Sequence, residues 1–513
     1  MRLTEAYVKA ALQGATPAAV CLLAALALLS VILYRLYFHP LKHIPGPLLA
    51  RTSSIFLYVI SYLGLEARVL RHYHKVYDTK VLRVAPNSVS VSDGASIHTI
   101  YVAGGGFAKD ARYANFNMGP VTTIFSSLDT DYRDLRAKAV APLFSTARLR
   151  TASLHGGVIH ECVSEFVTQL ASLKADCKTN HAKLDILDQC ARLSLDVVTG
   201  YLLNEPYGGL AEHQQLPMEK RRDAKLSINP FIFAIVGFSR FSLLPNWLFK
   251  FMYSLYSRFS FSEEVGRCFA SMDSFARRLV SQTLEVDPAK RQDSYQTRLL
   301  AAGITPSETE VQCQAVVFAG SDSTAVKLAT ILFHLVQNQD CLRRLKEELQ
   351  AAETEDEGLA LQEQPYLLAV IKEGLRVGMA NPTRMTRVVP AKGMLVGDVY
   401  IPPGTIVGVA PYIVHHDPAV FPDPFAFRPE RWLEGGRDNG LKRPNMDRSL
   451  LMFGAGLRAC IGRNLAQKQL TETIKAVVKS SVLEGARTCQ KRIELVEWFN
   501  AEIKGHTLDI EWP

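Results

Sequence analysis

The chain lacks any close pairing of cysteines. Its nine cysteines are dispersed along 513 residues, and no two of them form a C-x-x-C pair. An odd and scattered set argues against a disulfide framework, and also against a zinc site, whose ligands come at short and regular spacing. We therefore expect a reducing compartment and mostly buried thiols.

Long runs of one charge are also absent. The sequence has 58 Lys and Arg against 50 Asp and Glu, a formal net charge of +8, and its basic residues form no long cluster. This balance gives no indication of nucleic-acid binding, although it is compatible with a local positive face for an acidic protein partner. With 48% hydrophobic and 21% charged residues the chain is typical of a globular protein. Its length predicts one large domain or two fused lobes.

A long apolar segment is present near the N-terminus. Residues 15–34 carry no charge, and twenty helical residues span roughly 30 Å, which is enough to cross a bilayer core. A cleaved signal peptide is the alternative, but its apolar part would be only about 7–15 residues long. We therefore expect a membrane anchor at residues 15–37, preceded by a short segment at residues 1–14. A proline-rich hinge at residues 38–47 is expected to separate the anchor from one large domain at residues 48–513, because proline cannot continue a helix.

Periodicity predicts that this domain is mainly α-helical with small β-sheets. Helical patterns dominate most of it, and short strand-like runs follow at residues 397–401 and 405–410. Pro402-Pro403-Gly404 between the two runs is a strong turn signal. A long helix is expected from the capping pattern at residues 305–308 to about residue 338.

One cysteine has neighbours that require a special explanation. The run Phe453-Gly-Ala-Gly-Leu-Arg458-Ala-Cys460-Ile-Gly462 stands just before a helix-compatible stretch. Its glycines permit tight turns and the close approach of a flat ligand. A cysteine at the start of a helix faces free amide hydrogens and the positive end of the helix dipole, which favours the thiolate over the thiol. The ordinary alternative is a buried structural thiol.

This run resembles the haem-binding loop of the cytochrome P450 family, F-x-x-G-x-R-x-C-x-G, with every specified position filled. The resemblance implies the cytochrome P450 fold and a haem b cofactor whose iron has Cys460 as its axial ligand. It also implies that Phe453 and Arg458 lie against the haem, with Arg458 beside a propionate.

Three further residues resemble the ionic network that this family places behind the haem. Glu373 and Arg376 are three residues apart, which puts both on one face of a helix. They match the family's E-x-x-R pair, and Arg431 matches the arginine of its P-E-R-F loop, with Trp432 in the last place. The implied role is structural, and removing one partner of such a buried network costs about 3–5 kcal/mol. An ordinary surface ion pair is the alternative.

Other arginines resemble propionate ligands of the family. Arg387 begins a strand-like stretch, and it fits this role better than Arg384. Tyr132-Arg-Asp-Leu-Arg136 resembles the W-x-x-x-R helix, with tyrosine in place of tryptophan. The resemblance therefore implies that Tyr132, Arg136 and Arg387 bind the cofactor.

The expected long helix contains Ala319-Gly-Ser-Asp322-Ser323-Thr324, which resembles the family's A-G-x-D-T-T. A serine replaces the usual oxygen-activating threonine. The resemblance implies that Ser323 supplies the hydroxyl at the reacting oxygen and that Asp322 relays protons to it from solvent. Thr324 is a second candidate, although the next residue points roughly 100° around a helix. The Gly-Ser pair is also a typical place for a local opening of the helix. The alternative is a polar stripe that only packs helices.

Taken together, the resemblance covers nearly the whole chain and is strongest to microsomal members from filamentous fungi. It implies a monooxygenase that inserts one atom of O2 into a lipophilic small molecule, such as a terpenoid, polyketide or alkaloid intermediate of secondary metabolism. Electrons would come from NADPH through NADPH–cytochrome P450 reductase, with cytochrome b5 as a further candidate donor. The catalytic domain would face the cytosol from a single-pass anchor in the endoplasmic reticulum membrane, leaving residues 1–14 on the other side.

Basic residues around the cysteine loop and around residues 133–138 are candidates for the docking face of the acidic reductase. Two other functions remain open. One is a redox-neutral isomerase or dehydratase of the same fold, and the other is a non-catalytic membrane haem-binding protein. The expected walls of the substrate pocket are apolar segments at residues 104–125, 231–251, 318, 379–385 and 498–501.

Overall fold

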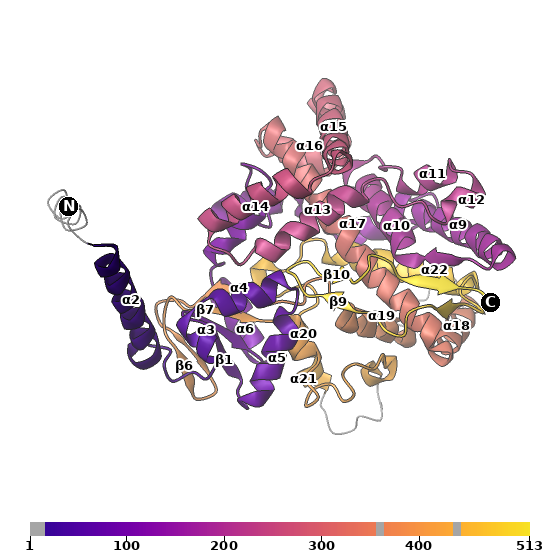
Figure 1. The fold of residues 1–513 in the computed structure, drawn as a ribbon. Helices are drawn as coiled ribbons and strands as arrows, with labels where there is room; N and C mark the ends of the chain where they lie inside the picture. The colour runs from indigo at the N-terminus through magenta and orange to yellow at the C-terminus, as the bar shows by residue number, and fades with distance from the viewer. Residues whose placement is uncertain (1–15, 355–363, 434–442) are drawn as a thin grey trace.

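Helices make up most of the fold, and small sheets are distributed around them (Figure 1). The computed structural model describes residues 16–354, 364–433 and 443–513. The expected N-terminal segment, residues 1–14, lies outside the described residues. The prediction of a mainly α-helical fold with small sheets is confirmed.

The helices of the first half are α2 (Pro17–Leu33), α3 (Leu48–Thr52), α4 (Ile55–Tyr62), α5 (Glu66–Val76), α6 (Ser96–Tyr101), α7 (Thr130–Val140), α8 (Thr146–Ala152), α9 (Val158–Asn180), α10 (Ile186–Leu203), α11 (Gly209–Gln214), α12 (Met218–Arg221), α13 (Asn229–Phe238) and α14 (Asn246–Ser260). Those of the second half are α15 (Glu263–Glu285), α16 (Tyr295–Ala301), α17 (Pro306–Gln337), α18 (Gln339–Thr354), α19 (Pro365–Val377), α20 (Pro411–His415), α21 (Arg443–Arg448) and α22 (Arg463–Lys479). Short helical turns used below are η1 (Tyr34–Phe38), η3 (Ala111–Phe116), η5 (Ser239–Phe241), η8 (Pro429–Trp432) and η9 (Gly456–Arg458).

The strands are β1 (Val81–Ala85), β2 (Ser88–Val91), β3 (Lys183–Asp185), β4 (Arg387–Val388), β5 (Met394–Val396), β6 (Val399–Ile401), β7 (Ile406–Val409), β8 (Arg487–Thr488), β9 (Leu495–Val496), β10 (Glu502–Ile503) and β11 (Asp509–Glu511). The largest sheet has the order β1-β2-β7-β4, in which β2 and β7 are parallel and the other pairs antiparallel. Two of its core pairs are Val89 with Val407 and Val91 with Val409. The two predicted strand-like runs correspond to β6 and β7, and the predicted turn lies between them.

The long helix α17 runs through the middle of the molecule (Figure 1) and begins as predicted. The Thr305 side chain accepts a hydrogen bond from the Glu308 amide, and Pro306 occupies the first turn. Much of the helix is buried, and it packs along α10. A Cβ atom on Gly320 would lie 2.5 Å from Cγ2 of Val198 in α10, so the glycine allows the two helices to approach closely.

The predicted opening at the Gly-Ser pair is wrong. The helix is α-helical throughout its length. The Ser321 hydroxyl donates to the Val317 carbonyl at 2.8 Å, four residues earlier, without interrupting it. Gly320 is needed for its small size against another helix, and a local sequence pattern cannot contain that information.

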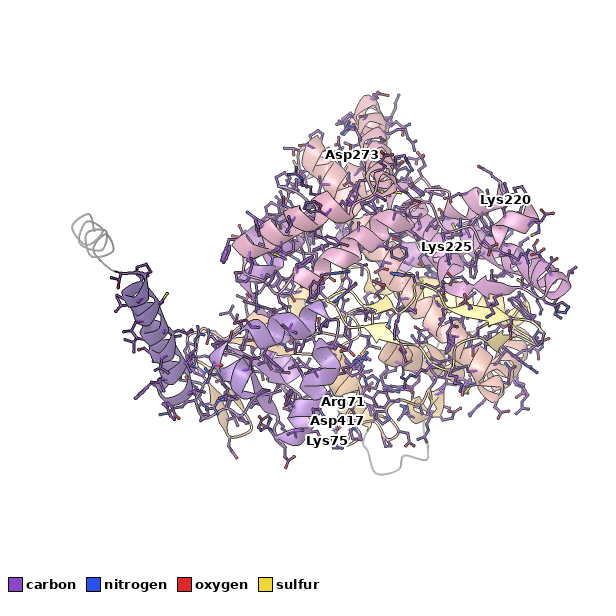
Figure 2. All side chains as sticks on the ribbon, in the orientation of Figure 1. Arg71, Lys75, Lys220, Lys225, Asp273 and Asp417 are labelled. Atoms are coloured by element: carbon purple, nitrogen blue, oxygen red, sulfur yellow. The ribbon has the colours of Figure 1, made fainter. Side chains whose placement is uncertain are left out.

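The first described helix, α2, stands apart from the rest of the molecule. It continues into the π-helical turn η1, and together residues 17–38 are long and apolar enough to cross a membrane. None of the α2 side chains is buried, and they project freely in Figure 2. The other helix that meets the same criteria is α17, which is mostly buried and belongs to the core.

The proline-rich stretch after η1 packs against the body. Leu41 and Ile44 are fully buried, and the Arg83 amide of β1 donates to the Pro45 carbonyl at 2.7 Å. A Cβ atom on Gly46 would lie 2.2 Å from the Arg83 carbonyl oxygen. The stretch is therefore held along the first strand by its backbone and by two apolar side chains.

Candidate active site

The cysteine loop lies between α21 and α22 in the chain and turns tightly at two glycines. Gly454 and Gly456 adopt positive φ values of 69° and 68°, and a Cβ atom on Gly456 would lie 1.8 Å from the Tyr101 carbonyl oxygen. The Cys460 amide donates to the Phe453 carbonyl at 2.8 Å, which closes the loop. Cys460 is exposed. The alternative of a buried structural thiol therefore does not describe this cysteine.

One side of α17 is accessible in the middle of the helix. Ala319 is exposed in the middle of this largely buried helix, and Ser323 is half-buried one turn later. The Ser323 hydroxyl donates to the Ala319 carbonyl at 2.9 Å, which leaves its oxygen able to accept. One turn further along the same face, Nζ of Lys327 lies 4.4 Å from the centre of the Phe453 ring. This contact joins the accessible face of the helix to the cysteine loop.

Asp322 and Thr324 lie on other faces of α17. Thr324 is only 4% exposed, and as the next residue in the helix it points about 100° away from Ser323. Asp322 lines a cavity of about 540 Å³ together with Glu502 and His506 of the C-terminal segment. Burial, and then the negative charge of Glu502, raise the pKa of Asp322 to about 7.

The cavity beside Asp322 contains several ionisable groups. Glu502 and His506 form an ion pair of 2.9 Å whose side chains are 14% and 47% exposed. The hydrogen bond from His506 to Glu502 raises the pKa of His506. Asp185 and Asp188 also line the cavity, and Asp185 pairs with Lys225, which is labelled in Figure 2. Sequence reasoning missed Glu502 and His506, because no motif surrounds them.

Four cations converge near the cysteine loop: Lys109, Arg133, Arg387 and Arg458. Burial and then the charges of Arg387, Arg458 and Arg133 hold the pKa of Lys109 well below its usual value. Burial and the charge of Arg133 likewise lower the pKa of Arg458. Arg133 is paired with Asp134, but no carboxylate forms an ion pair with the other three in the described part of the chain. Cations gathered in this way are costly unless an anionic group lies among them.

The sequence predicted Arg387 and Arg458 as ligands of the cofactor, but not Lys109 and Arg133. Arg387 donates to the Thr386 carbonyl at 2.8 Å and carries no ion pair, whereas Arg384 is paired with Glu66 at 3.0 Å. Arg387 is therefore free to bind an anion, whereas Arg384 already has a carboxylate partner. This agrees with the preference for Arg387. Lys109 and Arg133 gave no family signal in the sequence.

Tyr132 and Arg136 are engaged elsewhere. Nη2 of Arg136 donates to Oε2 of Glu308 at 2.8 Å. The hydroxyl of Tyr132 also donates to Glu308, and the guanidinium lies 3.3 Å from the centre of the tyrosine ring. Both side chains are thus tied to the first turn of α17. Their binding to a cofactor carboxylate stays a prediction, and it would have to compete with this ion pair.

The network of Glu373, Arg376 and Arg431 is assembled in the interior. Oε1 of Glu373 accepts from Nη2 of Arg376 at 2.8 Å and from Nε of Arg431 at 3.2 Å. The indole of Trp432 donates to Oε2 at 2.9 Å. Glu373 and Arg376 are 0% exposed, which rules out the surface-pair alternative. Burial raises the pKa of Glu373, but its bonds to Arg376 and the charge of Arg431 outweigh this effect and hold the pKa below the usual value.

An aromatic cluster lies beyond the site. Its members are Tyr113, Phe116, Phe125, Phe238 and Phe499, and the closest ring centres, those of Phe116 and Phe499, are 4.6 Å apart. The cluster brings together three of the segments expected to line the substrate pocket, residues 104–125, 231–251 and 498–501. Three of its rings also line a cavity of about 350 Å³ next to Glu66 and Arg112.

These features fit a haem. An exposed cysteine just before α22 can ligate a metal as thiolate. The side of α17 that carries Ala319 and Ser323 reaches the same loop through Lys327, and the glycine turns of the loop allow the close approach of a flat ligand. The cation cluster suits two carboxylates. These side chains therefore match an iron porphyrin with propionate groups.

Comparison with known proteins points to one family. The family model described as "Cytochrome P450" matches residues 56–488. Cytochrome P450 monooxygenase mfmF of Annulohypoxylon moriforme is 57% identical over 499 residues, covering 96% of this chain and 99% of that protein. Cytochrome P450 monooxygenase BOT1 of Botryotinia fuckeliana is 28% identical, covering 95% and 94%, and hkm5 of Aspergillus hancockii is 29% identical, covering 91% and 89%.

The buried network yields a test of stability. Glu373→Gln keeps the size of the side chain but leaves two buried guanidinium groups without their carboxylate, so we expect the free energy of unfolding at pH 7 to fall by about 3–5 kcal/mol. Because the pKa of Glu373 is depressed, its contribution is present above the ordinary carboxyl pKa and is lost as the pH falls through the folded-state value. The difference between variant and wild type should therefore shrink in acid.

Urea denaturation at pH 7 and in acid measures this difference. Glu472→Gln is the matched control, because its partly exposed pair with Lys468 is expected to contribute less than about 1 kcal/mol. Equal stability of Glu373→Gln and wild type at pH 7 would contradict a stabilising role for the network.

Proposed function

Since the chain belongs to the cytochrome P450 family, we propose that its monooxygenase activity inserts one atom of O2 into a lipophilic intermediate of fungal secondary metabolism, such as a terpenoid, polyketide or alkaloid. NADPH supplies the electrons through NADPH–cytochrome P450 reductase, and cytochrome b5 is a second donor. The observation that carries the proposal is the exposed Cys460 in a loop that α17 contacts beside its accessible residues. The aromatic cluster supports a lipophilic substrate, and the relatives are fungal monooxygenases.

Haem is held by groups from four parts of the chain in this proposal. Cys460 ligates the iron, and Lys109, Arg133, Arg387 and Arg458 bind the propionates. When bound there, a haem supplies the iron at which dioxygen is reduced and cleaved, and electron donation from the thiolate favours that cleavage. Phe453 holds the Cys460 amide through its carbonyl oxygen and so positions the ligand.

Proton delivery falls to the residues of α17 and the C-terminal segment. With a pKa of about 7, the Asp322 carboxyl can hold a proton near neutral pH and release it. The partly exposed His506 and its partner Glu502 connect the cavity of Asp322 with solvent. Ser323 lies next to Asp322 on the face toward Cys460, and its hydroxyl orients the reacting oxygen. A redox-neutral isomerase would not need to deliver protons to reduced dioxygen.

Contact of the body with a membrane is supported by exposed apolar residues of α14, α4 and α3. In α14, Trp247, Phe251 and Phe259 are exposed by 72%, 63% and 78%, and their spacing puts them along one side of the helix. Exposed apolar residues continue over α4 and α3, which contact η5 and η1. Exposed patches of this kind mark membrane or protein contacts. We assign the anchor to the endoplasmic reticulum membrane, with the body on the cytosolic side and residues 48–513 as the catalytic domain.

The reductase is proposed to dock over the cysteine loop. Exposed basic residues flank the loop in the chain or lie on α7, the helix that carries Arg133: Arg448, Arg463 and Lys138. Leu457, within the loop, is 63% exposed. A positive rim around an apolar centre suits an acidic electron-donor protein.

Expression with the reductase tests the function as a whole. Membranes containing the wild type are expected to consume NADPH and O2 and to form oxygenated metabolites that Cys460→Ala membranes lack, because the variant has no thiolate for the iron. Turnover should weaken at raised salt, since the docking face is charged. A metabolite profile for Cys460→Ala identical to that of the wild type would contradict the proposal. Product without NADPH would favour the redox-neutral isomerase, and haem binding without turnover would favour a non-catalytic protein.

The propionate assignment is tested by two neighbouring arginines. Arg133→Ala is expected to weaken haem binding by about tenfold or more, because it removes one cation of the cluster. Arg136→Ala on the same helix removes the same group and breaks the pair with Glu308, with little effect on haem. Transfer of haem to a scavenging apo-globin measures both. Faster haem loss from Arg136→Ala than from Arg133→Ala would restore Tyr132 and Arg136 as the propionate ligands.

The proton route predicts a pH profile. The fraction of NADPH electrons recovered in product is expected to fall as the pH rises through about 7, because Asp322 then loses its proton. Glu502→Gln removes a negative charge that raises the pKa of Asp322, so the midpoint should move to lower pH. Asp322→Asn should abolish the transition. Peroxide release and product are measured across pH 6–9, with the surface variant Glu494→Gln as control. An unchanged midpoint in Glu502→Gln would exclude Glu502 from the route.

A further inference from the structure

A buried lysine stands beside the cysteine loop. Lys327 is 6% exposed and lies one helical turn after Ser323, on the same side of α17. Lysine is rarely buried without a partner, because an ammonium group is costly to remove from water. In the described part of the chain Lys327 forms no ion pair and no side-chain hydrogen bond. Something other than an ordinary salt bridge must therefore offset the cost of burying its ammonium group.

The surroundings of the ammonium group point to the thiolate. Nζ lies 4.4 Å from the centre of the Phe453 ring, a cation–π contact that holds the charge in place. The carbonyl of the same phenylalanine accepts from the Cys460 amide at 2.8 Å. Burial lowers the pKa of Lys327, and the charge of Cys460 is the one influence that raises it. Lys327 and Cys460 are thus both held by Phe453, the lysine through the ring and the cysteine through the backbone carbonyl.

We propose that Lys327 is a positioning residue for electron transfer: its ammonium group, held on the Phe453 ring, places a positive charge beside the Cys460 thiolate and raises the reduction potential of the haem iron bound there. The inference rests on the proposed ligation of haem by Cys460. It goes beyond that function, since neither the cysteine motif nor the α17 motif contains this lysine.

The sign of the effect follows from charge. Reducing the iron by one electron adds one negative charge to the site, and a nearby cation stabilises that charge more than it stabilises the oxidised site. The interaction is little screened, because Lys327 is buried. The same cation draws electron density from the sulfur and makes the thiolate a weaker donor. Reduction by the partner protein therefore becomes easier, at the expense of electron donation to the iron.

The experiment measures the reduction potential of full-length holoenzyme by spectroscopic redox titration. Lys327→Gln and Lys327→Met are expected to lower the equilibrium constant for one-electron reduction at least tenfold, which is about 59 mV. Lys327→Arg retains the charge and should stay near the wild type. Lys290→Gln is the matched control, because it makes the same chemical change at an exposed lysine. In the carbon monoxide complex of the reduced protein, the C–O stretching frequency should fall in Lys327→Gln, since a stronger donor feeds more density to the ligand.

The outcomes separate the proposal from its premise. If the wild type has no thiolate-type carbon monoxide spectrum, haem ligation by Cys460 fails and the premise with it. If the wild type has that spectrum but Lys327→Gln keeps the wild-type potential and stretching frequency, the proposal is overturned. A potential in Lys327→Arg that falls as far as in Lys327→Gln also overturns it. If both neutral variants lose haem while Lys327→Arg keeps it, Lys327 binds a haem carboxylate, and the tuning role is again overturned.

Discussion

The carboxylate of Glu373 organises the half of the molecule that presents the cysteine. It binds Arg376 of its own helix and Arg431 of η8, and Arg376 passes the connection on by donating to the His415 carbonyl at 2.8 Å. The His415 ring, kept neutral because burial and the charge of Arg376 lower its pKa to about 3, accepts from the Leu451 amide at 2.9 Å. Leu451 stands two residues before the loop of Cys460. The Glu373 carboxylate in the core is thus linked by three hydrogen-bonded steps to the backbone just before the loop.

The central helix α17 divides two tasks between its faces. Ser323 and Lys327 lie toward the cysteine loop, whereas Asp322 lies in a separate cavity with Glu502 and His506. Adjacent residues of a helix point about 100° apart, so a side chain that handles protons can sit beside one that faces the cofactor without sharing its surroundings. Gly320 fixes the rotation and depth of the helix by its contact with Val198. The division of tasks therefore depends on one close helix–helix contact.

The sequence could predict what short local patterns determine. The fold class, the start of α17 and the candidate residues in the cysteine loop and the ionic network all lie within runs of fixed spacing. What it could not predict depends on elements far apart in the chain. Lys109 joins the cation cluster from a loop, and Glu502 approaches Asp322 from a C-terminal strand. On α7, spacing alone could not decide whether Arg133 or Arg136 faces the cation cluster, because that depends on the rotation of the helix against α17.

The packing of the proline-rich stretch couples the orientation of the anchor to that of the body. Leu41 and Ile44 are buried and Pro45 is hydrogen-bonded to β1, so the stretch moves with the sheet. When α2 tilts in the bilayer, the body therefore tilts with it, because no flexible linker separates the proline-rich stretch from the sheet. The natural place to sever the anchor lies before Leu41, since a cut after Pro47 would remove two core side chains and leave the Arg83 amide without its acceptor.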